Sequence, residues 1–172
     1  MKKLLTTISL ALTLCLSLTT VFAAPSINKN GAVKKDSILI NGEKVDANTT
    51  AAFDSKKETY SAAGVSDETI DVIEKVNANP SQLASLIKGV DLSGYSLLTE
   101  FQDLSVYVNG ELKQKVKNVT LTWEVPNLVK TAKNVKVLHY STERNTWEIL
   151  TPKSVDFDNK TITQEFKDLS PV

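Results

Sequence analysis

The sequence predicts an α+β protein that is mainly β, with a C-terminal antiparallel β-sandwich behind a short pair of helices. Three observations support this class. Apolar and polar residues alternate at period two through much of 104–166. Turn residues interrupt these runs at intervals of about ten residues, as in a sandwich. Between 66 and 90, apolar residues recur instead at the spacing of three to four that a helix requires.

The first 23 residues form a secretory signal peptide by pattern. Lys2 and Lys3 are a positive n-region, and Leu4–Leu18 is an apolar core that is shorter than the roughly 20 residues of a membrane span. We expect cleavage after Ala23, a secreted or cell-surface product, and contact with a membrane only through the secretion signal. Cys15 is the one cysteine of the chain, so the mature protein is disulfide-free.

Residues 24–65 are expected to be a flexible leader that carries one hairpin. Ala24–Asp36 is polar, and Asn41-Gly42 lies between two short apolar runs, which is a strong hairpin signal. A helical segment follows over 66–94. Ser66 is a helix cap and Asn79-Pro80 separates two helices, over about 66–78 and 80–89.

The β-sandwich domain is expected over 95–172. Val119, Leu121 and Trp123 share one face of a strand, and further strands are expected around 135–139, 147–149 and 161–166. The closing Leu169–Val172 has the pattern of a strand that is starting. We therefore expect the domain to be truncated at its last strand.

The segment 138–150, LHYSTERNTWEIL, contains the only histidine and is the strongest candidate for chemistry. His139 and Ser141 share a strand face, but residues two apart are separated by about 6.5 to 7 Å at their Cα atoms, too far for a Ser–His hydrogen bond. His-Tyr-Ser also resembles the tripeptide of self-cleaving β-sandwich domains. That resemblance implies a scissile bond Tyr140–Ser141, with Ser141 as nucleophile and His139 as base, and it requires backbone strain. We favour a structural role, with His139 at the edge of the core.

Other chemistries find less support. Asp156, Asp158 and Asn159 lack the glycine and distal glutamate of a calcium loop, so no metal site and no cofactor are expected. A formal net charge of zero argues against nucleic acid as a partner. Tyr107 and Tyr140 fall on the strand face opposite the core and are expected to be exposed, where they could contact a glycan or a protein.

Several segments together resemble uncharacterised small secreted proteins of clostridial-type Gram-positive bacteria. They are the signal sequence and the stretches LLTEFQDLSVYVNGE, NVTLTWEVPNLV, NVKVLHYSTERNTWEIL and FKDLSPV. The Trp-Glu alternation and the closing Ser-Pro-Val also resemble immunoglobulin-like modules of bacterial surface proteins. The resemblance implies an immunoglobulin-like sandwich and, by similarity only, a wall anchor after Val172. It offers no catalytic residues.

The sequence therefore predicts a secreted or cell-wall-associated surface module, structural or adhesive, that is not an enzyme. Its partner would be the cell wall, a host glycan or a surface protein. Two alternatives stay open: a self-processing domain cut at Tyr140–Ser141, and a carbohydrate-binding module that uses Tyr107 and Tyr140. The ligand, the oligomeric state and the biological role are not encoded in any pattern of the sequence.

Overall fold

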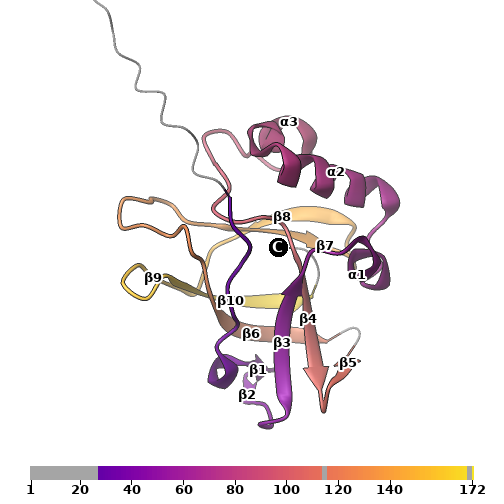
Figure 1. Ribbon diagram of the computed structural model, residues 1–172, viewed down its shortest axis with the longest axis vertical. Helices are drawn as coiled ribbons and strands as arrows, with labels where there is room; N and C mark the ends of the chain where they lie inside the picture. The colour runs from indigo at the N-terminus through magenta and orange to yellow at the C-terminus, as the bar shows by residue number, and fades with distance from the viewer. Residues whose placement is uncertain (1–26, 114–115, 170–171) are drawn as a thin grey trace, which may run out of the picture.

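The computed structural model describes residues 27–113, 116–169 and 172 of the chain (Figure 1). The protein is mainly β, with antiparallel strands and few helices, which confirms the predicted class. The predicted signal peptide, residues 1–23, lies outside the described residues. Within the described part of the chain, no helix is long and apolar enough to cross a membrane.

The described strands form three sheets, and every pairing between named strands is antiparallel. The largest sheet has the order β2-β1-β6-β10-β9, with bounds Glu43–Lys44, Leu39–Ile40, Lys117–Glu124, Thr161–Asp168 and Ser154–Asp156. A three-stranded sheet has the order β3-β4-β5, with bounds Thr49–Asp54, Asp103–Val108 and Glu111–Lys113. The third is a hairpin of β7, Val137–Ser141, and β8, Thr146–Leu150.

Two Asn-Gly turns close hairpins, as the sequence predicts at 41–42. Asn41 and Gly42 have φ values of 52° and 81°, and they connect β1 to β2. Asn109 and Gly110, with φ of 54° and 80°, connect β4 to β5 in the same way. Positive φ at both central residues is the geometry that matches the twist of the flanking strands, and Asn-Gly adopts it at low cost.

The helices lie between β3 and β4 in the chain and near β8 in space (Figure 1). Their bounds are Lys57–Ala62 for α1, Asp67–Ala78 for α2 and Leu83–Leu86 for α3, with short 3-10 turns at Lys35–Ser37 (η1) and Pro80–Gln82 (η2). The Ser66 side chain accepts a hydrogen bond from the backbone N–H of Thr69, which confirms the predicted cap. The second predicted helix, 80–89, is shorter than expected because the backbone is already extended at Ile87.

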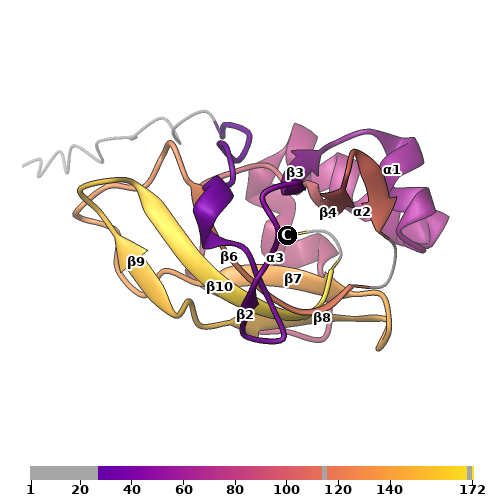
Figure 2. The same cartoon turned by 90° about the horizontal axis from the view of Figure 1, so that it is seen from below.

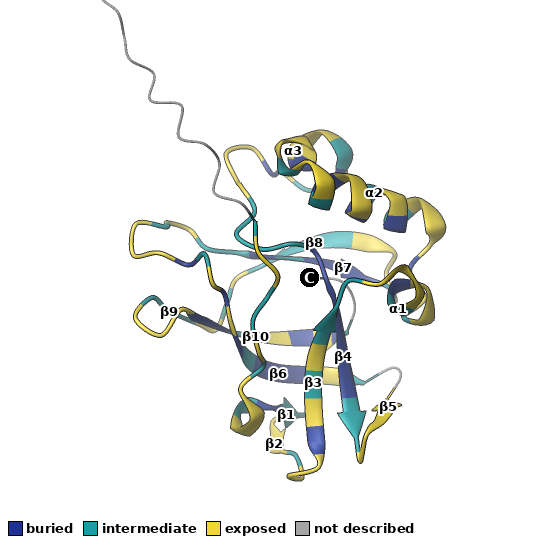
Figure 3. Cartoon of the chain, viewed as in Figure 1, coloured by how far each residue is buried: buried dark blue, intermediate teal, exposed yellow. Residues whose placement is uncertain are grey.

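Two apolar cores flank the β7–β8 hairpin. One core joins β4, β6 and β10 and contains Leu121 and Phe166; the other lies beneath the helices and contains Ile70 and Ile73. Val137 belongs to the first core and Tyr140 to the second, because successive side chains of β7 point to opposite faces. β7 is therefore buried on both of its faces, whereas its partner β8 is half-buried to exposed, as the colours of Figure 3 show; Figure 2 gives a second view of the arrangement.

The segment predicted as a flexible leader, 24–65, contributes the strands β1, β2 and β3 and the helix α1 to the fold. β1 pairs with β6, and β3 pairs with β4 along its whole length. Further upstream, the Gly31 N–H donates to the carbonyl of Glu124 at 2.8 Å. The prediction is wrong here because these short or Thr- and Ala-rich stretches carry a weak local signal, and long-range pairing determines their structure. The predicted boundary at residue 95 also separates strands that share a sheet.

Candidate functional site

His139 and Ser141 lie on β7, the strand between the two cores. Their exposed fractions are 1% and 0%, so neither reaches the surface. β7 pairs with β8 from Val137 opposite Leu150 to Ser141 opposite Thr146. No residue of β7 has a positive φ, so the backbone at Tyr140–Ser141 is an ordinary extended strand. Neither a positive φ nor a cis peptide bond marks strain at this bond.

The Ser141 hydroxyl is held by two partners that are not His139. Ser141 Oγ donates to Asp168 Oδ2 at 2.8 Å and accepts from the backbone N–H of Arg144 at 3.1 Å. A hydroxyl has a single hydrogen to donate, and here Asp168 accepts it. The hydroxyl thereby closes the turn after β7 and ties it to the end of β10.

Arg144 bridges two carboxylates at the end of the hairpin. Its Nη2 lies 2.7 Å from Asp168 Oδ1, and its Nε lies 2.7 Å from Glu148 Oε1. Burial raises the pKa of Asp168, but the hydrogen bond from Ser141 and the hydrogen bond and charge of Arg144 outweigh it and hold the pKa below its usual range. The hydrogen bond from Arg144 likewise lowers the pKa of Glu148.

His139 is packed as a neutral ring. Its imidazole lies 5.4 Å from the ring of Phe166, centroid to centroid, and its Nδ1 lies 3.6 Å from Glu148 Oε2. Burial lowers the pKa of His139 by more than the carboxylates of Asp168 and Glu148 raise it. An imidazole that stays neutral at physiological pH has a basic nitrogen, but Ser141 does not donate to it in this arrangement.

Together these side chains form a structural polar network. Serine hydrolysis needs a nucleophile bonded to a base and a base held by a third group. Here the serine is bonded directly to a carboxylate, while the histidine faces a different carboxylate. The sequence did not reveal Asp168 as the partner of Ser141, because the two are 27 positions apart and no local pattern links them. Glu143, which shares the parity of His139 and Ser141, leaves the strand and pairs with Lys117 at 2.5 Å.

The two tyrosines do not form a shared aromatic surface. Tyr140 is only 6% exposed and contacts Trp147 edge to face at a centroid distance of 5.2 Å, so the prediction that Tyr140 is exposed is wrong. The core beneath the helices, which contains Ile70 and Ile73, covers this face of β7. The helices were expected to form a separate segment, so the sequence did not predict this cover. Tyr107 is half-buried on β4, in another sheet, opposite Leu112.

The aspartates at 156–158 close the hairpin between β9 and β10. Asp156 Oδ1 accepts from the backbone N–H groups of Asp158 and Asn159 at 3.0 and 2.9 Å. These are the bonds of an Asx turn. Across the described residues, no three His, Cys, Asp or Glu side chains gather as a metal site would require.

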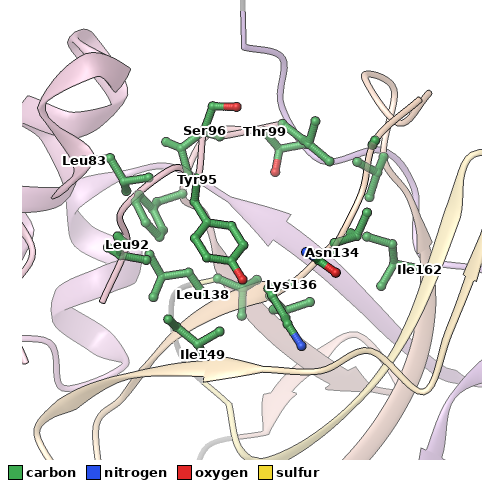
Figure 4. A pocket seen from close by; sticks show the side chains of 18 of the residues that line it. Leu83, Leu92, Tyr95, Ser96, Thr99, Asn134, Lys136, Leu138, Ile149 and Ile162 are labelled. Carbon is green, nitrogen blue, oxygen red and sulfur yellow. The ribbon is translucent and has the colours of Figure 1, made fainter. Parts of the chain in front are cut away.

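A cavity of about 260 Å³ lies beside the β7–β8 hairpin (Figure 4). Its walls come from the connection 92–99, from β7 and β8, and from the β6–β10 pair. The lining is mostly apolar, and Tyr95, Lys133 and Lys136 lie among it. The sequence did not predict this cavity, because its walls come together only through the packing of distant segments.

Comparisons with protein-family models, with curated proteins and with solved structures found no match for this chain.

Proposed function

We propose that this protein is a secreted or cell-surface module without catalytic activity, with a structural or adhesive role. The observation that carries the proposal is the commitment of the Ser141 hydroxyl to Asp168. It supports a structural role, and not a catalytic one, for the segment 138–150, which the sequence marked as the strongest candidate for catalysis. The proposal also includes the immunoglobulin-like relationship of the C-terminal strands and the kinship with clostridial-type secreted proteins.

Burial supports the same reading. Ser141 and His139 are 0% and 1% exposed, so a substrate could reach neither without opening the packing around β7. A catalytic nucleophile needs access and a base within hydrogen-bond reach. Access is lacking here, and the group that accepts the hydroxyl hydrogen of Ser141 is the carboxylate of Asp168, a weak base with a lowered pKa, and not His139.

The secretory part of the proposal is supported by the pattern of residues 1–23. A charged n-region, an apolar core and small residues at Ala23 and Ala24 follow the order of a signal peptide. The single cysteine within that segment agrees with a mature chain that is stable without a disulfide.

The two alternatives gain no specific support. Self-processing needs strain at Tyr140–Ser141, and β7 is regularly paired there. Glycan binding through Tyr140 needs an exposed ring, and Tyr140 packs against Trp147 inside the helical core.

Expression of the full chain in a Gram-positive host tests the location. We expect the protein in the medium or the wall fraction, and an N-terminus at Ala24 by N-terminal sequencing. A matched variant with Lys2→Glu and Lys3→Glu reverses the charge of the n-region and should reduce export. An unprocessed wild-type chain that stays inside the cell would refute the secreted location.

Intact-mass measurement of the purified protein tests the lack of self-processing. We expect one unbroken chain after prolonged incubation at neutral pH, both for the wild type and for Ser141→Ala. A cut between Tyr140 and Ser141 in the wild type, absent from Ser141→Ala, would overturn the proposal in favour of a self-processing domain.

A further inference from the structure

The cavity beside the hairpin has an apolar interior. Leu83 and Leu92 are buried at one side, Leu138 and Ile149 form the hairpin wall, and Ile162 of β10 faces them (Figure 4). An apolar pocket of this kind binds the apolar part of a ligand. Its volume of about 260 Å³ lies just below the roughly 300–1,000 Å³ of pockets that hold drug-sized ligands, and it suits a short alkyl chain.

The charged side chains of this cavity are all of one sign. Lys133 and Lys136 line it, and its described lining includes no Asp or Glu side chain. Lys136 Nζ donates to the neutral hydroxyl of Thr151 at 2.8 Å. Across the described residues neither lysine pairs with a carboxylate, whereas Lys117 and Lys153 pair with Glu143 and Glu165. Of the described side chains that line the cavity, only these two lysines are charged, and neither is paired with a side-chain carboxylate.

The exposed side chain of Tyr95 completes the mouth. It is 40% exposed, and in Figure 4 its ring extends across the cavity with the hydroxyl on the side of Lys136. Such a ring suits an amphipathic ligand. The Tyr95 ring can cover the apolar part of the ligand, and the Tyr95 hydroxyl offers a hydrogen-bonding group where the cavity meets water.

We propose that this cavity binds a small single-chain carboxylate, with its alkyl chain against Leu138 and Ile149 and its carboxylate beside Lys133 and Lys136. Charge complementarity selects the anionic head, and the apolar lining selects the chain. A polypeptide segment fits less well, because it would place unpaired backbone polar groups against this lining. The proposal goes beyond the surface-module function and does not depend on the secretion signal.

Isothermal titration calorimetry with three octyl probes tests it, using purified protein with the same N-terminus in every variant. We expect octanoate to bind with one site, and octanol to bind about tenfold more weakly, as loss of one charge-assisted contact implies. Octyltrimethylammonium should not bind. Vesicles of anionic phospholipid serve as a fourth arm, and we expect no binding to them.

The variant Lys133→Met with Lys136→Met should weaken octanoate binding at least about tenfold and leave octanol binding unchanged. Both side chains lie at the surface or half-buried, so the fold should survive, and near-UV circular dichroism checks it. Lys44→Met, on exposed β2, is the matched control and should bind octanoate as the wild type does. Equal affinity for octanoate and octyltrimethylammonium, an unchanged double variant, binding to vesicles alone, or no binding to any probe would each overturn the proposal.

Discussion

The burial of the Asp103 carboxylate can be tested by substitution. Asp103 begins β4, is 2% exposed, and lies opposite Asp54 in the register of β3 and β4. Burial raises its pKa to about 6, the hydrogen bond from Ser105 opposes the rise, and the charge of Asp54 adds to it. We predict that Asp103→Asn stabilises the protein at neutral pH and not at acidic pH.

The magnitude follows from the difference between the two states. An unfolded aspartate has a pKa of 3.8 and the folded one about 6, a difference of about two. At about 1.4 kcal/mol for each pKa unit, ionised Asp103 costs the folded state about 3 kcal/mol. Because the folded pKa is raised, the folded state binds the proton more tightly. The penalty is therefore absent below about pH 4 and grows until the pH has passed about 6.

Urea unfolding of both proteins, followed by tryptophan fluorescence between about pH 4 and pH 8, measures this difference. We expect the free energy of unfolding of Asp103→Asn, relative to wild type, to rise by about 3 kcal/mol across that range. His139 titrates in both proteins, so its contribution cancels. Asp71→Asn on the exposed face of α2 is the matched control. A difference between Asp103→Asn and wild type that does not change with pH would refute the assigned burial of Asp103.

Three further substitutions test other contacts, each by urea unfolding at neutral pH. Tyr60→Phe removes a buried hydroxyl that donates to the backbone carbonyl of Phe101 at 2.8 Å. It should cost only about 1 kcal/mol of stability, since Asn77 still donates to that carbonyl. A cost near zero would contradict the hydrogen bond. Gly31→Ala places a Cβ 2.6 Å from the Cβ of Glu124 on β6 and should cost about 1–3 kcal/mol of stability. The control Ala32→Ser, at an exposed position, should be neutral. A Gly31→Ala variant as stable as the wild type would mean that residues 28–34 do not pack against β6. Ser141→Ala should cost about 2 kcal/mol of stability at pH 7 and less at pH 3, because the Ser141 hydroxyl stabilises the ionised form of Asp168. An equal loss of stability at both pH values would contradict this contact.

Features that depend on local chemistry were predictable from the sequence. The turn at Asn41-Gly42 is determined by residues that tolerate positive φ, and the start of α2 is determined by the cap at Ser66. The alternation along β6 likewise identifies Trp123 as a core residue, and it is 3% exposed. In each case the sequence distance between the interacting groups is short.

Features that depend on distant packing were not predictable. β3 has a half-exposed Thr- and Ala-rich pattern that resembles a loop, and it becomes a strand only by pairing with β4. Alternation alone assigns the faces of β7, but it cannot show that a helical core covers Tyr140. The same limit applies to the candidate site, because the partner of Ser141 comes from the far end of β10 and the cavity walls come from segments that lie far apart in the chain.

The position of β10 has a consequence for how the chain folds during synthesis. β10 is the last named strand, yet it lies inside the largest sheet between β6 and β9 and brings Phe166 into the core. A nascent chain therefore cannot close this core until residue 168 has left the ribosome. Long-range pairing of this kind also slows folding. The strand order itself therefore postpones closure of this core to the end of β10 synthesis, because β10 supplies the partner that β6 needs inside the sheet.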